Sequence, residues 1–312
     1  MPEPNKTAYV FPGQGSQKVG MGRDLFDNFE SAKKVFQEAD QTLGFAISKL
    51  CFEGPEEELR QTINAQPALV VMSFACYKAA ISIANQNKVF KPSFLGGHSL
   101  GEYTALAISG VLDFPTTVYL SRERGRLMFE SGLKTPGSMA AILGLDETVV
   151  LELCRETNTW LANINCPGQL VISGSKENMD RAITLAKSKG AARVLPLQVS
   201  GAFHSPLMQP AADGLSAIIN KLSFQKPDIP IIANTSARPL STAEEIKDEL
   251  MRQLCNTVQW QRSVEYMIEG GVSTFIEIGA GNVLTGLIKR INKSVKTFNI
   301  STAGELNNIV SQ

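Results

Sequence analysis

Histidine is scarce in this chain: only two of its 312 residues are histidine, His98 and His204. Two imidazoles exclude a histidine-rich metal centre. Imidazole is also the side chain whose ordinary pKa lies near neutrality, so a general base near pH 7 is expected to be one of these two. Net charge is lacking too, because 30 Lys and Arg balance 30 Asp and Glu. Nucleic-acid binding needs a clustered basic excess, and we expect no nucleic-acid partner.

Cysteine pairs and long apolar runs are also missing. The five cysteines are odd in number and scattered without a CxxC pair, which indicates reduced thiols in a cytoplasmic protein rather than a disulfide framework or a zinc site. The longest apolar stretch, residues 68–84, includes Ser73 and Lys78 and is shorter than the ~20 apolar residues of a membrane span. Residues 1–9 lack the long apolar segment of a signal peptide. We therefore expect a cytoplasmic chain with no membrane partner.

The order of predicted strands and helices is that of an α/β protein. Apolar runs such as residues 7–11, 94–97 and 229–234 predict short buried strands. Residues 22–43, 56–63 and 67–87 have the patterning of helices, with Pro67 in a first helical turn, and the polar last ten residues are expected to be frayed. Residues 137–199 instead predict the order β-α-β-β-α-β of a ferredoxin-like unit. The chain length favours two domains. We expect an α/β-hydrolase-like large domain with a parallel sheet, formed by residues 1–136 and 200–312, and an inserted ferredoxin-like small domain at residues 137–199.

A candidate nucleophile lies in the segment Gly97-His98-Ser99-Leu100-Gly101. A short apolar strand precedes this GxSxG pattern and an apolar helix follows it, which is the arrangement of a nucleophile elbow. At the helix N-terminus, unpaired N–H groups and the helix dipole favour negative charge near the serine. The pattern alone also fits a glycine-rich turn with a capping serine. The flanking strand and helix favour Ser99 as a nucleophile.

A serine nucleophile needs a general base. His98 is adjacent to Ser99 on a sharp turn, where neighbouring side chains diverge, so it is badly placed to remove the proton. His204 lies in a loop between a predicted strand and a predicted helix, where open α/β sheets gather functional groups, and is the base by elimination. No carboxylate within residues 100–203 stands out as its partner, since Asp146 is better explained as a helix cap. Either a backbone carbonyl orients His204 or the acid is hidden.

Arg124 stands on the apolar face of a predicted helix. At 100° per residue it shares that face with Leu120, Leu127 and Met128. A guanidinium cannot lose its charge there and needs an anionic partner. One interpretation is a buried ion pair with a distant Asp or Glu. The other is that Arg124 receives a carboxylate of the substrate through two hydrogen bonds.

Two other glycine-rich loops follow predicted strands, at residues 12–17 and 279–281. Neither matches GxGxxG, and no Gly-Lys-Ser/Thr follows, which excludes dinucleotide-binding and P-loop motifs. Both loops are suited to bringing backbone N–H groups close to a ligand. Such groups could complete an oxyanion hole.

Together these segments resemble the malonyl-CoA:acyl carrier protein transacylases and related acyltransferase domains of fatty-acid and polyketide synthesis. The resemblance covers nearly the whole chain in the order of the family. The matching segments are FPGQGSQ (11–17), GHSLGEY (97–103), RERGRLM (122–128), MAAILGL (139–145), NINCPGQLVISG (163–174), GAFHSPLM (201–208), NTVQWQRSVEYM (256–267) and EIGAGNVL (277–284).

The resemblance implies roles for individual residues. Ser99 matches the acyl-accepting serine, His204 its base, and Arg124 the arginine that pairs with the free carboxylate of malonate. By the same resemblance, three other residues complete the machinery. Their positions match those that supply two oxyanion-hole N–H groups and the carbonyl that orients the histidine, and they are Gln14, Leu100 and Gln253.

Asn165 matches an asparagine of the small domain that lines the pocket in the family. The implied reaction is a ping-pong transfer of malonyl from malonyl-CoA, through malonyl-serine, to the phosphopantetheine thiol of acyl carrier protein. Coenzyme A is then a substrate, and we expect no cofactor, no metal and a monomer. Carrier proteins of this kind are acidic, and Lys289 with Arg290 is a candidate docking patch. The alternatives are a serine thioesterase or esterase, a discrete polyketide-synthase acyltransferase, and a silent binding domain.

Overall fold

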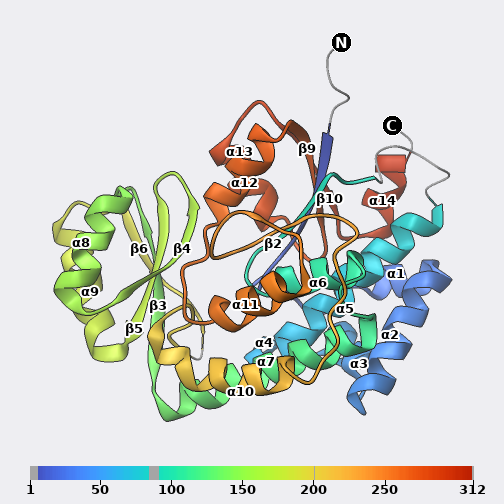
Figure 1. Cartoon of the computed structure of the whole chain (residues 1–312), viewed down its shortest axis with the longest axis horizontal. Helices are drawn as coiled ribbons and strands as arrows, with labels where there is room; N and C mark the ends of the chain where they lie inside the picture. Colours follow the sequence, from blue (N-terminus) through green and yellow to red (C-terminus); the bar gives the residue numbers. More distant parts are fainter. Residues whose placement is uncertain (1–5, 84–90, 200, 311–312) are drawn as a thin grey trace.

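The computed structural model describes residues 6–83, 91–199 and 201–310. Two sheets organise the chain (Figure 1). The six-stranded sheet has the order β10-β9-β1-β2-β7-β8 and the four-stranded sheet the order β4-β5-β3-β6. The strands of the larger sheet are β1 (Lys6–Phe11), β2 (Phe94–Gly97), β7 (Ile231–Ile232), β8 (Pro239–Leu240), β9 (Val272–Ile278) and β10 (Lys296–Ile300). Those of the smaller sheet are β3 (Gly137–Leu143), β4 (Trp160–Cys166), β5 (Gln169–Ser175) and β6 (Arg193–Pro196).

Helices surround both sheets. The helices that pack around the larger sheet are α1 (Arg23–Asn28), α2 (Glu30–Leu43), α3 (Ile47–Glu53), α4 (Glu56–Arg60), α5 (Thr62–Ile83), α6 (Gly101–Ile108), α7 (Phe114–Lys134), the 3₁₀ turn η2 (Pro206–Met208), α10 (Gln209–Ile219), α11 (Ala243–Gln253), α12 (Trp260–Glu269), α13 (Val283–Ile291) and α14 (Ala303–Val310). The smaller sheet carries α8 (Glu147–Thr157) and α9 (Lys176–Ser188).

The larger sheet is parallel from β10 to β7, and only β8 runs antiparallel. Its alternating side chains enter two separate cores, as the period of two in a strand requires. From β1, Tyr9 and Phe11 pack on one face with α5, α6 and α7, whereas Ala8 and Val10 pack on the other with α12 and α13. A parallel sheet buried on both faces matches the fold class predicted from the sequence.

The loops that carry the predicted functional residues meet at one edge of this sheet. Phe11 at the end of β1 pairs with Gly97 at the end of β2. Because the two strands are parallel, the loop with Gln14 and the turn with Ser99 leave the sheet side by side. The fold therefore brings these two segments, about 85 residues apart in the sequence, to the same place.

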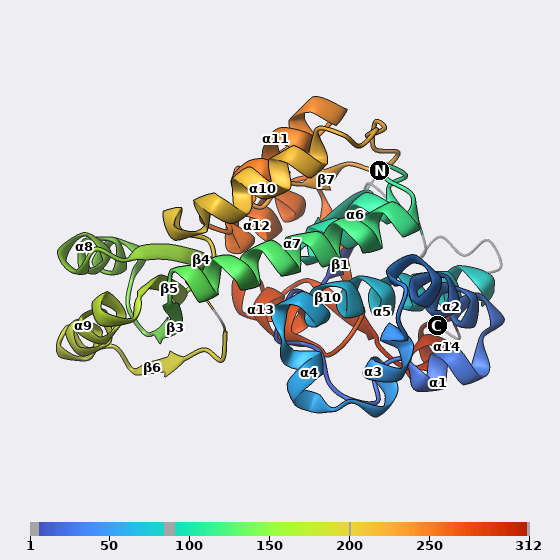
Figure 2. The same ribbon diagram turned by 90° about the horizontal axis from the view of Figure 1, so that it is seen from below.

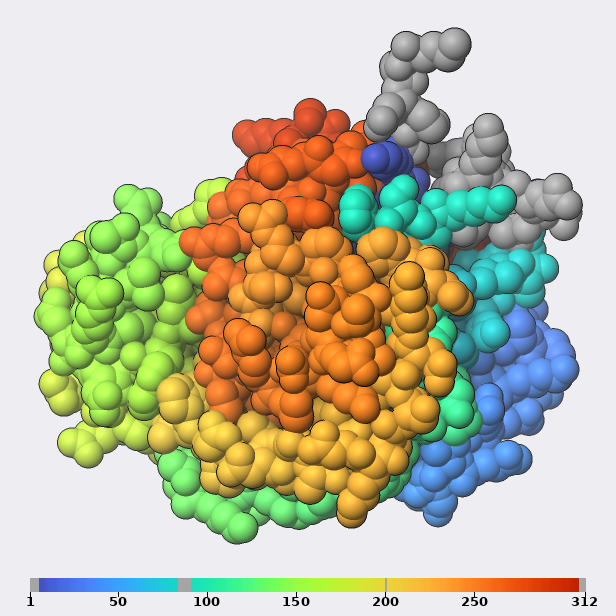
Figure 3. Space-filling model, in the orientation of Figure 1, coloured from blue at the N-terminus to red at the C-terminus, as the bar shows by residue number. Residues whose placement is uncertain are grey.

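The smaller sheet is antiparallel and shows the predicted order β-α-β-β-α-β. Alternation divides its two faces: Ala140, Ile142 and Ile172 pack against α8 and α9, whereas Met139 and Val171 face the main body. The space-filling view shows this unit as a lobe at one side of the molecule (Figure 3). The long helix α7 runs through the main body and leads into β3 (Figure 2).

Helix α5 is the one described helix that is long and apolar enough to cross a membrane. Within the folded protein, 72% of its most apolar 18-residue stretch is buried. It packs against α7 and α2 and belongs to the main core. This is the pattern of a core helix.

The boundaries of several helices differ from those predicted. The segment 22–43 is broken at Phe29, whose extended backbone (φ −129°, ψ 114°) separates α1 from α2. Helix α5 begins at Thr62, so Pro67 lies inside the helix and not in its first turn. The remainder of that predicted helix extends into residues 84–90, outside the described residues. Asp146 stands at the N-cap of α8 as expected, but its side chain makes no capping hydrogen bond.

Five described elements were not predicted: α3, α12, α14, β8 and β10. Residues 303–310, expected to be frayed, form α14, which packs against β10. The predicted strand at residues 229–234 is reduced to Ile231–Ile232. Of these elements, α3, α14 and the strands are short, so their periodicity is weak in the sequence and tertiary packing decides their structure. Helix α12 has ten residues and a clear amphipathic pattern, and the sequence prediction overlooked it.

Candidate active site

The predicted strand–turn–helix around Ser99 is present between β2 and α6. Ser99 has a positive φ of 51°, a backbone conformation that non-glycine residues rarely adopt and that occurs mainly at functional sites. The turn is tight: a Cβ atom on Gly97 would lie 1.9 Å from the carbonyl carbon of Gly101. A Cβ atom on Gly101 would lie 2.0 Å from the carbonyl oxygen of Phe11. The two glycines are therefore required by close packing of the backbone.

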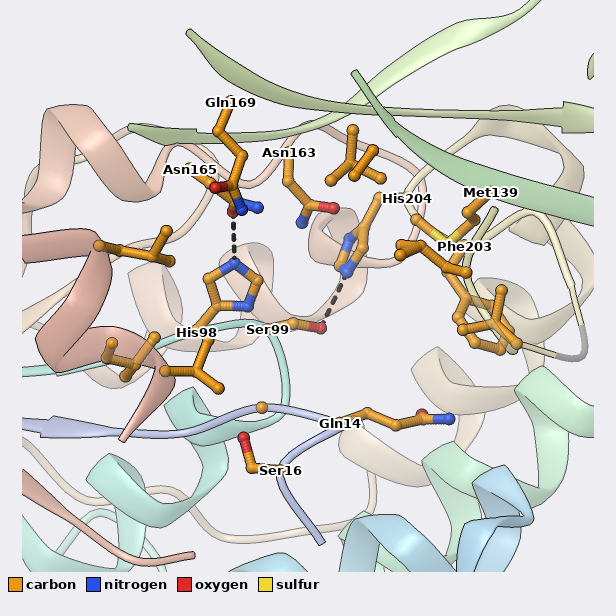
Figure 4. Close-up of a pocket in the computed structure, with 18 of the residues that line it drawn as sticks. Gln14, Ser16, His98, Ser99, Met139, Asn163, Asn165, Gln169, Phe203 and His204 are labelled. Carbon is orange, nitrogen blue, oxygen red and sulfur yellow. Dashed lines mark hydrogen bonds between the residues drawn. The ribbon is translucent and has the colours of Figure 1, made fainter. Parts of the chain in front are cut away.

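His204 stands opposite the serine (Figure 4). Its Nε2 lies 2.8 Å from Ser99 Oγ, and its Nδ1 lies 2.9 Å from the carbonyl oxygen of Gln253. Because a carbonyl only accepts, Nδ1 carries the proton and Nε2 is free to accept the serine proton. The partner of the histidine is thus a backbone carbonyl and not a carboxylate, which decides between the two interpretations that the sequence left open.

The protonation state of His204 suits a base. Burial, reinforced by the positive charge of Arg124, lowers the pKa of His204 to about 3. The imidazole is therefore neutral at pH 7 in the free protein. Its backbone also has a positive φ, 56°, so both the serine and the histidine are held in uncommon conformations.

His98 points away from the serine. Its Nε2 lies 2.9 Å from Asn165 Oδ1 on β4, and its ring meets Trp260 edge-on at 5.7 Å (Figure 4). Burial lowers the pKa of this histidine as well. The divergence of neighbouring side chains that the sequence predicts is therefore observed, and Asn165 connects the smaller sheet to the turn that bears Ser99.

Arg124 is 1% exposed and has no carboxylate within salt-bridge distance among the described residues. Its Nη1 donates to Gln66 Oε1 at 2.8 Å, and its Nη2 donates to Gln253 Oε1 at 2.9 Å and to Ser99 Oγ at 3.1 Å. Its Nε is buried and has no partner among the described residues. The guanidinium also lies over the ring of Tyr103, 5.3 Å from the centroid. A buried cation with spare donors beside the nucleophile favours the substrate-carboxylate interpretation over the structural ion pair.

The N–H groups of Leu100 and Gln14 flank the serine. Neither donates a hydrogen bond to another residue in the described segments. Leu100 directly follows Ser99 at the start of α6, and Gln14 lies in the adjoining loop after β1. These two N–H groups are therefore the candidates for stabilising an oxyanion on a carbonyl bound at Ser99.

A cleft of 250 Å³ opens beside the serine. Gln14 and residues of α13 line it from the main body, and Met139, Asn165 and Val171 line it from the smaller sheet. Phe203 also faces it (Figure 4). Among the described residues, no three His, Cys, Asp or Glu side chains lie close enough together to hold a metal ion.

Three buried polar residues that support this site were missed in the sequence. Gln66 holds Arg124 from α5. Asn234 accepts from the N–H of Ser99 at 2.7 Å and donates to the carbonyl of Gly97 at 2.8 Å. Glu102, in the first turn of α6, is fully buried. Gln66 and Glu102 could have been found as polar residues within mostly apolar helical segments. No comparable signal in the sequence pointed to Asn234.

The site brings together a candidate nucleophile, a neutral imidazole held by a backbone carbonyl, and two N–H groups without a partner among the described residues, and such a set is suited to acyl transfer. A family model described as an acyl transferase domain matches residues 8–307. The chain belongs to this acyl transferase family. The enzyme is 45% identical over 302 residues to the malonyl CoA-acyl carrier protein transacylase of Bacillus subtilis (strain 168), covering 95% of this chain and 94% of that protein. The malonyl CoA-acyl carrier protein transacylase of Staphylococcus aureus (strain MW2) is 44% identical over 303 residues. The match covers 96% of this chain and 96% of that protein.

Solved structures agree with this assignment. One is a malonyl-transacylase in complex with its type II polyketide-synthase acyl-carrier protein, with a TM-score of 0.94, 40% identity, and coverage of 98% of this acyltransferase and 99% of that chain. Another is the acyl carrier protein S-malonyltransferase of Vibrio cholerae, with a TM-score of 0.93, 40% identity, and coverage of 98% and 100%. The resemblance inferred from the sequence motifs is confirmed.

The packing of the elbow generates a stability prediction. We expect Gly101→Ala to destabilise the acyltransferase by about 3 kcal/mol, because the new methyl group would collide with the backbone of Phe11. The matched control is Gly286→Ala in α13, where a Cβ atom meets nothing within 4 Å, and which should be neutral or slightly stabilising. Urea unfolding of both variants measures the effect. Equal midpoints would show that the elbow backbone tolerates the methyl group.

Proposed function

We propose that Ser99 carries the acyl group in a two-step transfer and that His204 moves the protons. The enzyme transfers a malonyl group from malonyl-CoA to acyl carrier protein. The observation that carries the assignment of roles is the chain of contacts Ser99 Oγ–His204 Nε2–His204 Nδ1–Gln253 carbonyl beside the Arg124 guanidinium. Each group has the protonation state that its step needs.

In the first step, Ser99 Oγ attacks the thioester carbonyl carbon of malonyl-CoA while its proton passes to His204 Nε2. The oxyanion of the tetrahedral intermediate rests on the N–H groups of Leu100 and Gln14. Collapse breaks the carbon–sulfur bond, and the departing thiolate of coenzyme A takes the proton from His204. Malonyl-Ser99 remains. The carbonyl of Gln253 stabilises the imidazolium that forms on the way.

In the second step, the phosphopantetheine thiol of the carrier protein gives its proton to His204 and attacks the ester carbonyl carbon. Collapse of the second intermediate releases malonyl-thioester, and Ser99 Oγ recovers the proton from His204. Apart from malonyl-CoA and the phosphopantetheine thiol, every group that reacts in these steps belongs to the enzyme. We therefore infer that no cofactor takes part. A reaction that exchanges free thiols suits the reducing cytoplasm.

Arg124 selects the acyl group. Its guanidinium, with an unpartnered Nε, pairs with the free carboxylate of malonate and thereby holds the thioester carbonyl next to Ser99. An acetyl group supplies no counter-charge and leaves the cation unpaired. Phe203 lines the same cleft and bounds the space beside the malonyl methylene.

The carrier protein is expected to approach the open side of the cleft. We propose that residues 137–199 act as an inserted small domain whose inner face forms one wall of the channel for the phosphopantetheine arm, against residues 1–136 and 200–312. Arg290 on α13 donates to Gln169, which lines the cleft, and so places a positive charge at its rim. Lys289 donates to the carbonyl of Val295 instead. Of this pair, Arg290 is the better candidate for an acidic partner.

Transfer and hydrolysis are separated by one experiment. We expect the enzyme with malonyl-CoA alone to release coenzyme A in a single stoichiometric burst, and to turn over only when holo-carrier protein is added. Ser99→Ala should eliminate both the burst and the covalent malonyl label, because the attacking oxygen is gone. A chromogenic thiol reagent measures the release of coenzyme A, and mass spectrometry of the intact protein measures the covalent label. Complete hydrolysis without carrier protein would identify a thioesterase, and labelling of Ser99→Ala would place the nucleophile elsewhere.

Arg124 generates a selectivity prediction. Arg124→Ala should lower kcat/KM for malonyl-CoA by at least about 100-fold, since removing one partner of a buried ion pair costs about 3–5 kcal/mol. The loss for acetyl-CoA should be much smaller. Arg122→Ala is the control, because Arg122 lies on the same helix but bonds to the Ile63 carbonyl away from the cleft. If the two acyl groups lose equally, Arg124 is a structural residue.

The acid limb of the pH profile tests the electrostatic coupling. Because the Arg124 charge contributes to lowering the pKa of His204 to about 3, kcat/KM of the wild type should stay flat down to about pH 4. Arg124→Met removes the cation, so the pKa of His204 rises and the base becomes protonated at higher pH. The acid limb for acetyl-CoA should then move upward. A limb at unchanged pH would mean that burial alone sets the pKa of His204.

A further inference from the structure

The side chain of Gln253 contacts the catalytic groups from the end of α11. Its Nε2 donates to the carbonyl oxygen of Ser99 at 3.0 Å and to Glu102 Oε2, and its Oε1 accepts from Arg124 Nη2 at 2.9 Å. Its backbone carbonyl accepts from His204. One residue thus touches the nucleophile, the base and the arginine. The side-chain amide therefore holds Arg124 relative to the turn that bears Ser99, whereas the backbone carbonyl holds His204.

The orientation of the Gln253 amide is determined by its partners. Nε2 has two hydrogens, and both of its partners, the Ser99 carbonyl and the Glu102 carboxyl oxygen, are acceptors. Only Oε1 can then face Arg124, which has donors alone. A flipped amide would direct its N–H groups at the guanidinium and its oxygen at two other oxygens.

Glu102 is the side-chain acceptor that, together with the Ser99 carbonyl, holds the amide in this orientation. It is 0% exposed and lies in the first turn of α6, three residues after Ser99. One carboxyl oxygen accepts from the N–H of Asn234 at 3.2 Å and the other accepts from Gln253. Both carboxyl oxygens of Glu102 accept here, whereas an amide of the same shape can accept at only one end. Burial, reinforced by the neighbouring Glu249, raises the pKa of Glu102 well above its usual range, so this side chain acts on Arg124 through hydrogen bonds and not as a buried counter-charge.

We propose that Glu102 is the positioning residue for acyl selectivity, holding the Gln253 amide so that its oxygen keeps Arg124 ready for the substrate carboxylate. The inference rests on the proposed malonyl transfer. Glu102 itself touches neither substrate nor the reacting atoms. Its effect on Arg124 passes through the Gln253 side chain, whereas His204 is held by the Gln253 backbone carbonyl, which remains when the side chain is changed.

This separation gives a readout that a purely structural role would not move. Glu102→Gln keeps the volume of the side chain and removes one acceptor, which allows the Gln253 amide to turn away from Arg124. We expect kcat/KM of Ser99 acylation to fall by about tenfold for malonyl-CoA, the equivalent of one hydrogen bond to a charged group, and by less than about threefold for acetyl-CoA. The malonyl-to-acetyl ratio is the measured quantity.

A double-mutant cycle tests the route of the effect. In the Gln253→Ala background, adding Glu102→Gln should leave the ratio unchanged, because the amide through which Glu102 acts is absent. Glu277→Gln is the matched control: Glu277 is also a buried carboxyl group that accepts from backbone N–H groups, but it lies on β9 and bonds to Leu284 and Thr285 and not to Gln253. It should preserve the ratio. Thermal melts of all variants check that each is folded at the assay temperature.

Three outcomes would overturn the proposal: an equal loss for both acyl groups in Glu102→Gln, full additivity with Gln253→Ala, or a loss of the same size in Glu277→Gln. The first would assign Glu102 to folding or to His204. The second would show a path that bypasses the amide, and the third a general effect of buried charge. These outcomes differ from failure of the proposed function itself, which would appear as a wild-type enzyme that does not malonylate carrier protein.

Discussion

The buried, unpaired charge of Arg124 is the constraint on which the rest of the site depends. A guanidinium that is 1% exposed loses most of its hydration. Among the described residues, hydrogen bonds to amide and hydroxyl oxygens replace that water, and no carboxylate does. Dipoles hold the side chain in position without neutralising it. We propose that the remaining deficit drives the binding of an acyl group that brings its own negative charge, and that the selectivity of the site follows from it.

The same charge connects substrate selection to the strength of the base. Arg124 stands close enough to His204 to depress the pKa of the imidazole. Burial is the larger cause of this low pKa, so we expect a malonate carboxylate that neutralises the guanidinium to raise the pKa of His204 only in part. On this proposal, a charged acyl group strengthens the base that acts on it. An acyl group without a carboxylate leaves the pKa of the base unchanged.

Local features of the sequence predicted the principal residues. Ser99 follows from the strand–GxSxG–helix order, His204 from the shortage of histidines, and Arg124 from helical periodicity. The supporting contacts were not predictable in this way, because they join residues far apart in the sequence. Gln253 bonds to Arg124, 129 residues away, and to Glu102, 151 residues away. The fold shows the same division. The ferredoxin-like order was readable from strong alternation, whereas short elements such as α14 and β10 depend on distant packing.

In the hydrolase pattern a carboxylate orients the histidine, and the contacts of this site give a physical reason for a carbonyl in its place. A carboxylate bonded directly to His204 would raise the pKa of the imidazole and would also compete with the substrate for Arg124. Here a carbonyl orients the histidine, and the buried acid Glu102 contacts the Gln253 amide. Burial raises the pKa of Glu102 well above its usual range, which disfavours a negative charge on this group. Because no carboxylate of the described residues lies within salt-bridge distance of Arg124, we propose that the carboxylate of the acyl group takes that place.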